Sequence, residues 1–307
     1  MNNRTSLSSF FIKTKAEKEK KKILIFDFHN LVFRTLFVSA FAAKKQLMTD
    51  EEMYDYWKYL LINSLFNAIR NNKPSRVILA IDEGGSWRKE VYSLYKANRK
   101  EARDAAIVDF EAFWPVFNKF LDEMKQTFKN LYMMKIERCE ADDIIAVITK
   151  KECGAETDIT IITTDKDMVQ LMKYPNVHLY DPIRRKNIKS INPERDLQIK
   201  IIAGDKSDNI PAIKKRCAGR TALKMLMEGL DNYFVDPIIK SNYERNTQLV
   251  DFNCIPKEIV KNIEDQYANY KIDKIDGMKI LIFLARNKIN QFADNISQYL
   301  PSLRVLN

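Results

Sequence analysis

Short apolar runs that each end in an acidic residue constrain the fold of this chain more than any other feature. The run 23–26 (Ile-Leu-Ile-Phe) is followed by Asp27, and the run 77–81 (Val-Ile-Leu-Ala-Ile) is followed by Asp82. Continuous apolar runs of this length are typical of strands that are buried on both faces. Helical patterns separate the runs, and strands that alternate with helices indicate a parallel sheet covered by helices on both sides.

The same patterns predict the order of elements along the chain. We expect strands over 22–28, 76–82, 131–136, 158–163 and 177–180. We expect helices over 30–43, 51–71, 109–130, 140–151, 166–173, 193–203, 219–230, 242–251, 256–270 and 277–299. The chain after residue 190 is therefore predicted to be helical.

Acidic residues gather at the predicted strand ends, at one helix start and in tight loops. Glu140, Asp142 and Asp143 open one helix, where the helix dipole favours anions but cannot hold three close carboxylates ionised. Because ligands of parallel sheets bind at the carboxyl ends of the strands, the fold should bring distant acids together. Such a set is typical of a site for hard divalent cations, although any single acid could instead be a solvated cap or turn. The nine acids are Asp27, Asp82, Glu140, Asp142, Asp143, Asp165, Asp167, Asp205 and Asp208.

The cysteine and histidine content excludes several other kinds of site. The four cysteines form no close pair, which excludes a CxxC zinc site and gives no disulfide framework. Two histidines among 307 residues argue against zinc-based or histidine-based catalysis. No apolar run approaches the length that spans a membrane. We therefore expect a cytoplasmic protein without a membrane partner, located in the host cytoplasm if the chain is viral.

The charge balance points to a polyanionic partner. The formal net charge is +10 although the chain carries 41 acids. If the nine acids are sequestered in a metal site, the remaining surface is more basic still. A basic surface around an acidic, metal-loaded centre suits nucleic acid, whereas charge alone also fits a merely soluble basic protein.

The stretch 87–103 combines cations with the aromatic residues Trp87, Tyr92 and Tyr95. Cations can meet phosphates while rings stack on bases, as in single-strand binding. A solvated charged helix is the alternative, but the position directly after the Asp82 strand favours nucleic-acid binding. The six cations are Arg88, Lys89, Lys96, Arg99, Lys100 and Arg103.

The acidic motifs follow one another in an order that resembles the flap endonuclease (5′-nuclease) family, in particular the ribonuclease H of T-even bacteriophages. The stretches 95–100 (Tyr-Lys-Ala-Asn-Arg-Lys) and 242–246 (Asn-Tyr-Glu-Arg-Asn) support the narrower likeness. The resemblance runs from about residue 22 to about residue 256. The motifs are Asp27, Asp82, Glu140-Ala141-Asp142-Asp143, Asp165-Lys166-Asp167 and Gly204-Asp205-Lys206-Ser207-Asp208-Asn209.

The resemblance implies a PIN-like α/β fold, in which a parallel sheet flanked by helices carries a helical arch. It also implies a C-terminal helical region with a helix-hairpin-helix-type element. We accordingly divide the chain into a basic tail over 1–21, a nuclease core over 22–190 with the arch over about 84–108, and a DNA-binding helical region over 191–307.

The resemblance also implies a catalytic centre with two Mg²⁺ ions, which Mn²⁺ could replace. Asp27, Asp82, Glu140 and Asp142 would surround the first ion. Asp165, Asp167 and Asp208 would hold the second ion, with Asp142 between the two, while Asp143 and Asp205 would act through water. Lys96 and Arg99 match the cations at the base of the arch that polarise the scissile phosphate.

The resemblance implies that further residues of the arch and of the stretch after it bind nucleic acid. The arch would contribute Arg88, Lys89, Tyr95, Lys100 and Arg103. The stretch 204–222 resembles the element that grips the duplex backbone, but 211–219 lacks the glycine-rich hairpin that lets backbone amides approach a phosphate. We expect side-chain contacts to phosphate to substitute, from Lys214, Lys215, Arg216 and Arg220.

These observations together predict a monomeric, structure-specific 5′ nuclease that removes RNA primers or DNA flaps. Its substrates would be DNA and RNA–DNA hybrids with a 5′ flap or nick, and a single-strand DNA-binding protein is a candidate partner. A PIN-like ribonuclease acting on single-stranded RNA and a catalytically silent nucleic-acid-binding module stay open as alternatives. A phosphatase with an Asp-x-Asp nucleophile ranks last, because 27–29 (Asp-Phe-His) lacks the second Asp.

The tail carries a second candidate partner site over residues 4–11. Leu7 stands three residues before Phe10 and Phe11, which is similar to short sliding-clamp-binding peptides, except that Arg4 replaces the usual Gln. A sliding clamp is therefore a candidate partner. The alternative is that the two rings pack against the body of the protein, or that the tail is idle.

Overall fold

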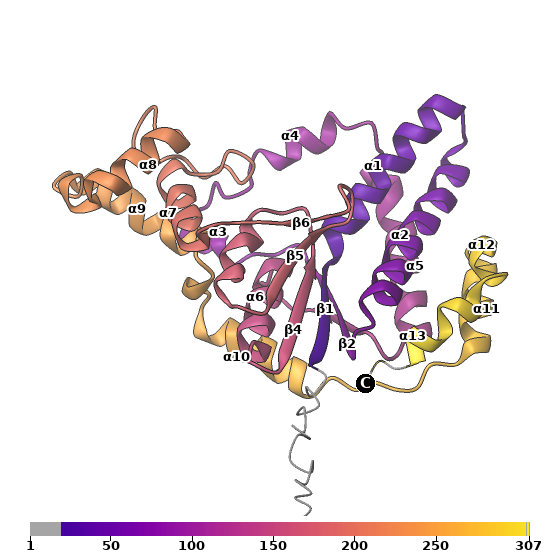
Figure 1. Cartoon of the computed structure of the whole chain (residues 1–307). Coiled ribbons are helices and arrows are strands. Elements are labelled where there is room, and N and C mark those ends of the chain that lie inside the picture. The colour runs from indigo at the N-terminus through magenta and orange to yellow at the C-terminus, as the bar shows by residue number, and fades with distance from the viewer. Residues whose placement is uncertain (1–19, 305, 307) are drawn as a thin grey trace, which may run out of the picture.

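A six-stranded sheet forms the middle layer of the molecule, in the strand order β3-β2-β1-β4-β5-β6 (Figure 1). The structure is a computed structural model and describes residues 20–304 and 306. Neighbouring strands pair in parallel except for β5 and β6. The strands are β1 (Lys21–Asp27), β2 (Arg76–Ile81), β3 (Tyr132–Lys135), β4 (Thr157–Ile162), β5 (Val177–Asp181) and β6 (Lys186–Ile188).

The apolar runs form strands because both of their faces are buried. Along β1, Leu24 and Phe26 join one hydrophobic cluster, whereas Ile23 and Ile25 join another on the opposite face. Successive strand residues point to opposite faces, so a continuous apolar run is what a sheet covered on both sides requires. This confirms the predicted class of an α/β sheet flanked by helices.

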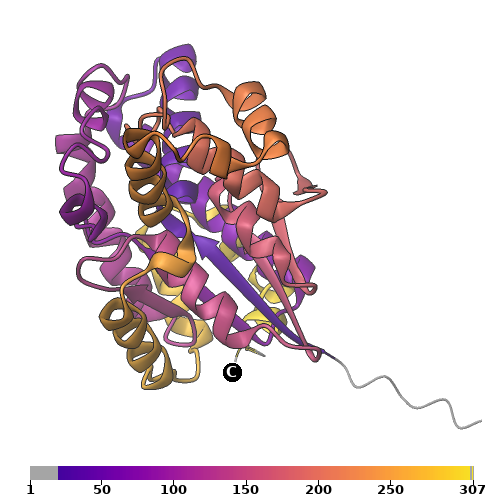
Figure 2. The same cartoon turned by 90° about the vertical axis from the view of Figure 1, so that its left-hand side faces the viewer.

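The helices form one layer on each face of the sheet and a further group beyond its carboxyl edge (Figures 1 and 2). The first face packs against α1 (Phe28–Gln46), α2 (Asp50–Asn72), α5 (Phe110–Thr127), α11 (Gly277–Arg286), α12 (Asn290–Ala293), the 3-10 turn η4 (Ile296–Gln298) and α13 (Leu300–Arg304). The second face packs against α6 (Ala141–Glu152), η1 (Asp167–Lys173) and α10 (Lys257–Ala268).

The third group of helices builds the surroundings of the carboxyl edge. Its small clusters of buried residues are separate from the two clusters on the sheet. The arch segment contributes α3 (Arg88–Val91) and α4 (Arg99–Asp104). The chain after β6 contributes α7 (Pro193–Ala203), α8 (Gly219–Glu228), η2 (Leu230–Asn232), α9 (Pro237–Val250) and η3 (Phe252–Cys254).

Three details of the predicted elements are wrong. The sheet is not wholly parallel, because β6 adds an antiparallel edge strand that its polar sequence did not indicate. The segment 166–173 contains a 3-10 helix, η1, rather than an α-helix. The predicted helix over 277–299 is broken: Lys288 adopts a left-handed conformation (φ 57°), and the Ile289 amide donates to the Leu284 carbonyl (2.8 Å), which ends α11.

The last helices return to the main core. Phe283 of α11 packs against Phe120 and Phe128, with ring centroids 5.4 and 5.2 Å apart. The predicted boundary at residue 190 stays a prediction, but α11–α13 share the core of α2 and α5 rather than that of α7–α9. Among the described helices, none combines the length and the apolar character needed to cross a membrane.

Candidate active site

Two predicted site acids stand at the carboxyl ends of adjacent strands. Asp27 is the last residue of β1 and accepts hydrogen bonds from the Thr163 hydroxyl (2.9 Å) and the Asn30 amide (3.2 Å). Asp82 directly follows β2 and accepts a hydrogen bond from the Ala141 amide at the start of α6 (2.6 Å). Thr163 follows β4, so Asp27 lies where the strand order reverses between β1 and β4, a usual place for a ligand site.

The start of α6 adds acids to the same edge. Glu140 is the N-cap residue of α6, and Asp142 lies in its first turn. Burial and the neighbouring charges of Asp165 and Asp27 raise the pKa of Asp142 well above its ordinary value. Asp142 at the helix start thus lies close enough to Asp27 and Asp165 for their negative charges to interact.

The carboxylates at the strand ends lie close enough to repel one another. Burial, together with the charges of Asp82 and Asp165, raises the pKa of Asp27 to about 7. Among the described side chains, none of Asp27, Asp142 and Asp165 forms an ion pair. The protein's own cations therefore leave this part of the set largely uncompensated, with Lys96 acting on Asp142 from a distance.

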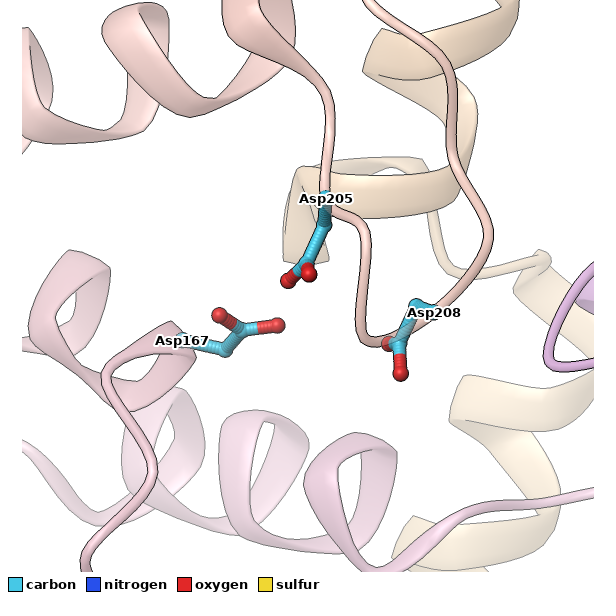
Figure 3. Close-up of side chains that lie close together, drawn as sticks. All are labelled: Asp167, Asp205 and Asp208. Carbon is cyan, nitrogen blue, oxygen red and sulfur yellow. The ribbon is translucent and has the colours of Figure 1, made fainter. Parts of the chain in front are cut away.

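A second group joins η1 to the 204–211 loop. Carboxylate oxygens of Asp167, Asp205 and Asp208 all lie within 4.8 Å of one another, with Asp167 facing the two loop residues (Figure 3). The Lys200 ammonium forms ion pairs with Asp205 (2.7 Å) and Asp167. Burial raises the pKa of Asp167 to about 6, even though Lys200 lowers it.

The donor set fits divalent cations. Hard cations such as Mg²⁺ prefer carboxylate oxygens as ligands. A bound cation would also supply the positive charge that a cluster of carboxylates needs to stay ionised. The structure brings Asp205 together with Asp167 and Asp208. The resemblance implies that Asp205 acts through water and that Asp165 joins Asp167 and Asp208. The division of the acids between two ions stays a prediction.

Two cations of the arch base face these acids. The Lys96 ammonium pairs with Glu140 and lies 3.9 Å from Asp208, and the Arg99 guanidinium lies 2.7 Å from Asp208. Burial would raise the pKa of Glu140, but the charges of Lys96 and Arg88 outweigh it and lower that pKa to about 2. Glu140 is thus held ionised beside the predicted catalytic cations.

Three predicted site residues are structural instead. Arg88 is 3% exposed and pairs with Asp143, which is fully buried and also accepts from the Trp87 indole (3.1 Å). A buried guanidinium with these partners cannot reach a phosphate, and Asp143 has no free face for a metal or its water. Tyr95 is 3% exposed, and its hydroxyl lies 3.0 Å from Glu140, so its ring is not available for stacking on a base.

Most of the other predicted nucleic-acid contacts are open to solvent. Lys89 and Arg103 are exposed on α3 and α4, and the Lys100 side chain lies outside the part of the chain that the structure describes. Lys215, Arg216 and Arg220 are exposed between α7 and α8 or at the start of α8. Lys214 is half-buried, with its ammonium 4.8 Å from the centre of the Tyr233 ring.

Sequence reasoning missed two supporting residues. Lys200 has no local signal, although it stands four residues before Gly204 and so lies in the last turn of α7. His29 packs among aromatic rings, and its Nδ1 also accepts a hydrogen bond from the Asp82 amide (2.9 Å), while burial lowers its pKa. Its position two residues after Asp27 was the only hint.

Family models match most of the described chain. The 5′-3′ exonuclease N-terminal resolvase-like domain matches residues 22–205, and the T4 RNase H C-terminal domain matches residues 227–299. Ribonuclease H of Enterobacteria phage T4 is 29% identical over 306 residues, which cover 92% of this chain and 97% of the phage protein. A 5′-3′ exonuclease of Mycoplasmopsis pulmonis is 32% identical over 210 residues, or 65% of this chain and 64% of that protein.

Solved structures with the same fold come from bacteriophage T5. The T5 5′-exonuclease with bound zinc ions gives a TM-score of 0.62 at 20% identity and covers 82% of this chain and 100% of that chain. The T5 flap endonuclease in a complex with DNA and metal ions gives a TM-score of 0.62 at 21% identity, with coverages of 81% and 98%. The chain belongs to the 5′-3′ exonuclease family, and it is a 5′ nuclease that hydrolyses phosphodiester bonds.

Proposed function

We propose that this protein is a Mg²⁺-dependent, structure-specific 5′ nuclease that removes RNA primers and 5′ flaps during DNA replication. The observation that carries the proposal is the meeting of two sets of residues at one edge of the sheet. Acids gather there from the ends of β1 and β2, the start of α6, η1 and the 204–211 loop, and Lys96 and Arg99 of the arch base pair with two of the acids, Glu140 and Asp208. Carboxylates that face a polyanion are useful only if cations lie between them.

The acids are proposed to hold two Mg²⁺ ions, with Mn²⁺ as a substitute. Asp27, Asp82, Glu140 and Asp142 would bind one ion, and Asp165, Asp167 and Asp208 the other. Bound ions of this kind neutralise a phosphate and lower the pKa of water, which supplies the nucleophile. Asp205 lies close enough to Asp167 and Asp208 to contribute to the second site.

The arch base is proposed to act directly on the substrate. Lys96 is largely buried against Glu140, whereas the Arg99 side chain is about half exposed. An incoming phosphate can compete with these acids for both cations, because charge-assisted hydrogen bonds to phosphate are strong. Lys96 and Arg99 would then stabilise the negative charge that develops on the phosphate during cleavage.

The exposed cations between α7 and α8 would hold the duplex. Lys215, Arg216 and Arg220 are exposed together and lie outside the acidic centre. Phosphate contacts of this kind fix the register of the duplex without reading its sequence. This division matches an enzyme that recognises a structure, namely a nick or a flap, rather than a base sequence.

Two further partners are proposed. Residues 4–11 would bind a sliding clamp, and these residues lie outside the described part of the chain. A single-strand DNA-binding protein would be a second partner on a replicating template, and the enzyme would act as a monomer. The four free cysteines support a reducing, cytoplasmic location, in the host if the protein is viral.

Digestion of labelled substrates tests the proposal against its alternatives. A 5′-labelled flap duplex should release short products with Mg²⁺ and none with a chelator. A PIN-like ribonuclease would instead cleave linear single-stranded RNA, and a silent binding module would retain the flap duplex without cutting it. Cleavage of the linear RNA in preference to the flap would refute the proposal.

A further inference from the structure

The base of the arch is fastened to the loop that carries two of the site acids. The Lys96 amide donates to the Asp208 carbonyl (2.9 Å). The Asn209 side-chain amide donates to the Leu94 carbonyl (2.7 Å), and the Asn98 side-chain amide donates to the Lys206 carbonyl (2.9 Å). These hydrogen bonds run in both directions across the junction between the arch base (92–99) and the 204–211 loop.

Both sides of this junction contain a residue in the left-handed region. Lys96 and Asn209 each have φ of 57°. For a lysine this conformation costs about 1–2 kcal/mol, whereas asparagine adopts it more readily. The conformation of Lys96 therefore needs support from its surroundings, and the hydrogen bond on its own amide gives part of that support.

The loop is a rigid base for such support. The Asp205 amide donates to the Ile210 carbonyl (2.8 Å), and the Ile210 amide donates to the Asp205 carbonyl (2.7 Å). These two hydrogen bonds close the loop as an antiparallel bridge. Gly204 has φ of +71°, and a Cβ there would lie 2.4 Å from the Ile210 carbonyl oxygen. Only glycine fits this position, so the loop backbone is tightly constrained.

We propose that Asn209 is a positioning residue that latches the arch base to this loop and so places Lys96 and Arg99 over the acids. The latch fixes the Leu94 carbonyl two residues before Lys96, where the chain must turn into its left-handed conformation. Asn98 supports the same junction from its exposed side. The inference rests on the proposed function, because it assigns Asn209 a role in placing the proposed catalytic cations.

The latch is independent of the ion pairs at the junction. Arg99 and Tyr95 hydrogen-bond to the Asp208 side chain, whereas the Asn209 side chain donates to a backbone carbonyl of the arch base. Removing the Asn209 amide therefore leaves every charged group at the site in place. A small displacement of Lys96 would follow, and a misplacement of about 1 Å can lower a rate by about 100-fold.

Asn209→Gly isolates the latch, because glycine accepts the positive φ but offers no side-chain amide. We expect single-turnover cleavage of the flap duplex to slow by about 10- to 100-fold, with duplex affinity in a chelator changed by less than about twofold. Hydrogen exchange of the backbone amides over 92–99 should accelerate in the same variant. Asn176→Ala is the matched control, since Asn176 also donates to a loop carbonyl, that of Gly154 (2.9 Å), but beside the start of β5.

A double-mutant cycle separates positioning from a general loss of structure. In a Lys96→Ala, Arg99→Ala background, Asn209→Gly should add less than about a twofold further loss, because both groups that it positions are already gone. Additive losses, an unchanged cleavage rate, or unchanged hydrogen exchange over 92–99 would each overturn the latch. If Asn209→Gly fails to fold, Asn98→Ala decides in its place, with a smaller loss of rate in the same direction.

Failure of the latch can be told apart from failure of the proposed function. If the wild-type protein does not cut the flap duplex, the proposed function fails and hydrogen exchange alone decides whether the latch exists. If the wild-type protein cuts and both latch variants cut equally well, the latch fails while the proposed function stands.

Discussion

Arg88 and Asp143 form a buried ion pair, with the guanidinium Nη2 atom 2.8 Å from the carboxylate Oδ1 atom. Both residues lie in motifs that the sequence marks as functional, one in the cationic arch segment and one in the acidic stretch. Their pairing fastens the arch segment to the start of α6, where Arg88 also contacts Glu140 (3.0 Å). Arg88 and Asp143 thus affect the site indirectly, because their pairing holds the arch segment against the start of α6.

The buried pair leads to a first prediction, on stability. Arg88→Ala should lower the free energy of unfolding by ~3–5 kcal/mol, because it leaves the Asp143 carboxylate buried without its partner. Urea unfolding measures the change. Arg138→Ala is the control, since Arg138 pairs with Glu90 and Glu258 on the exposed surface and should matter far less. Equal losses in the two variants would contradict the structural role of Arg88.

The second prediction concerns the acid that follows β4. Asp165→Asn should reduce flap cleavage to the background level while the protein stays folded, because a proposed ligand of the second ion is lost. Asp165 also raises the pKa of Asp27 and of Asp142, so its removal relieves repulsion. We expect an equal or higher melting temperature in a chelator, measured by calorimetry. Wild-type cleavage by this variant would show that Asp165 is not part of the metal centre.

The third prediction is a pH dependence that divalent metal removes. The pKa of Asp27 is about 7 in the folded chain and 3.8 in its ordinary state, so the carboxyl takes up a proton on folding. Stability in a chelator should therefore fall as pH rises from about 4 to about 7, by roughly 1.4 kcal/mol for each unit of pKa difference. Saturating Mg²⁺ should offset the decline, since it takes the place of the proton.

Asp27→Asn tests which group causes that decline. The variant has no carboxyl to ionise at this position, so its stability in a chelator should fall less steeply with pH than that of the wild type. Urea unfolding at pH 5 and pH 7.5 gives the comparison. If the two proteins lose the same stability between these pH values, Asp27 is not the group responsible.

The fourth prediction separates catalysis from binding. Lys96→Ala should slow cleavage by ~100-fold or more with little change in duplex affinity, because Lys96 faces the acids of the site. Lys215→Ala should weaken duplex binding and reduce the salt dependence of binding by about one unit of slope, because Lys215 is exposed outside the centre. Single-turnover rates and fluorescence anisotropy measure the two effects. Parallel losses of rate and affinity in both variants would argue against this division.

The fifth prediction concerns the proposed clamp peptide in the tail. A Phe10→Ala, Phe11→Ala double variant should lose stimulation by a sliding clamp loaded on DNA, because few anchors carry most of the binding energy of such peptides. Its activity without the clamp should equal that of the wild type. Stimulation that survives the double substitution would rule out the peptide as the contact.

The sequence by itself determined the parallel strands of the sheet and the position of the acids at their ends. Runs such as 23–26 are apolar at every position, which is typical of a strand buried on both faces, and the structure confirms β1 there. Asp27 and Asp82 end such runs, so parallel pairing places them at one edge. These properties depend on a few neighbouring residues and on the direction of the strands, and both can be recognised in the sequence.

Only the tertiary structure decided which polar residues of the motifs face the site. Tyr95 and Arg99 stand in the same cationic stretch, yet Tyr95 is buried, whereas the Arg99 side chain is about half exposed and pairs with Asp208. The difference arises from contacts with Asp208, more than a hundred residues away, and from the left-handed turn at Lys96. Burial and ion pairing depend on such distant contacts, and no local pattern of charge in the sequence predicts them.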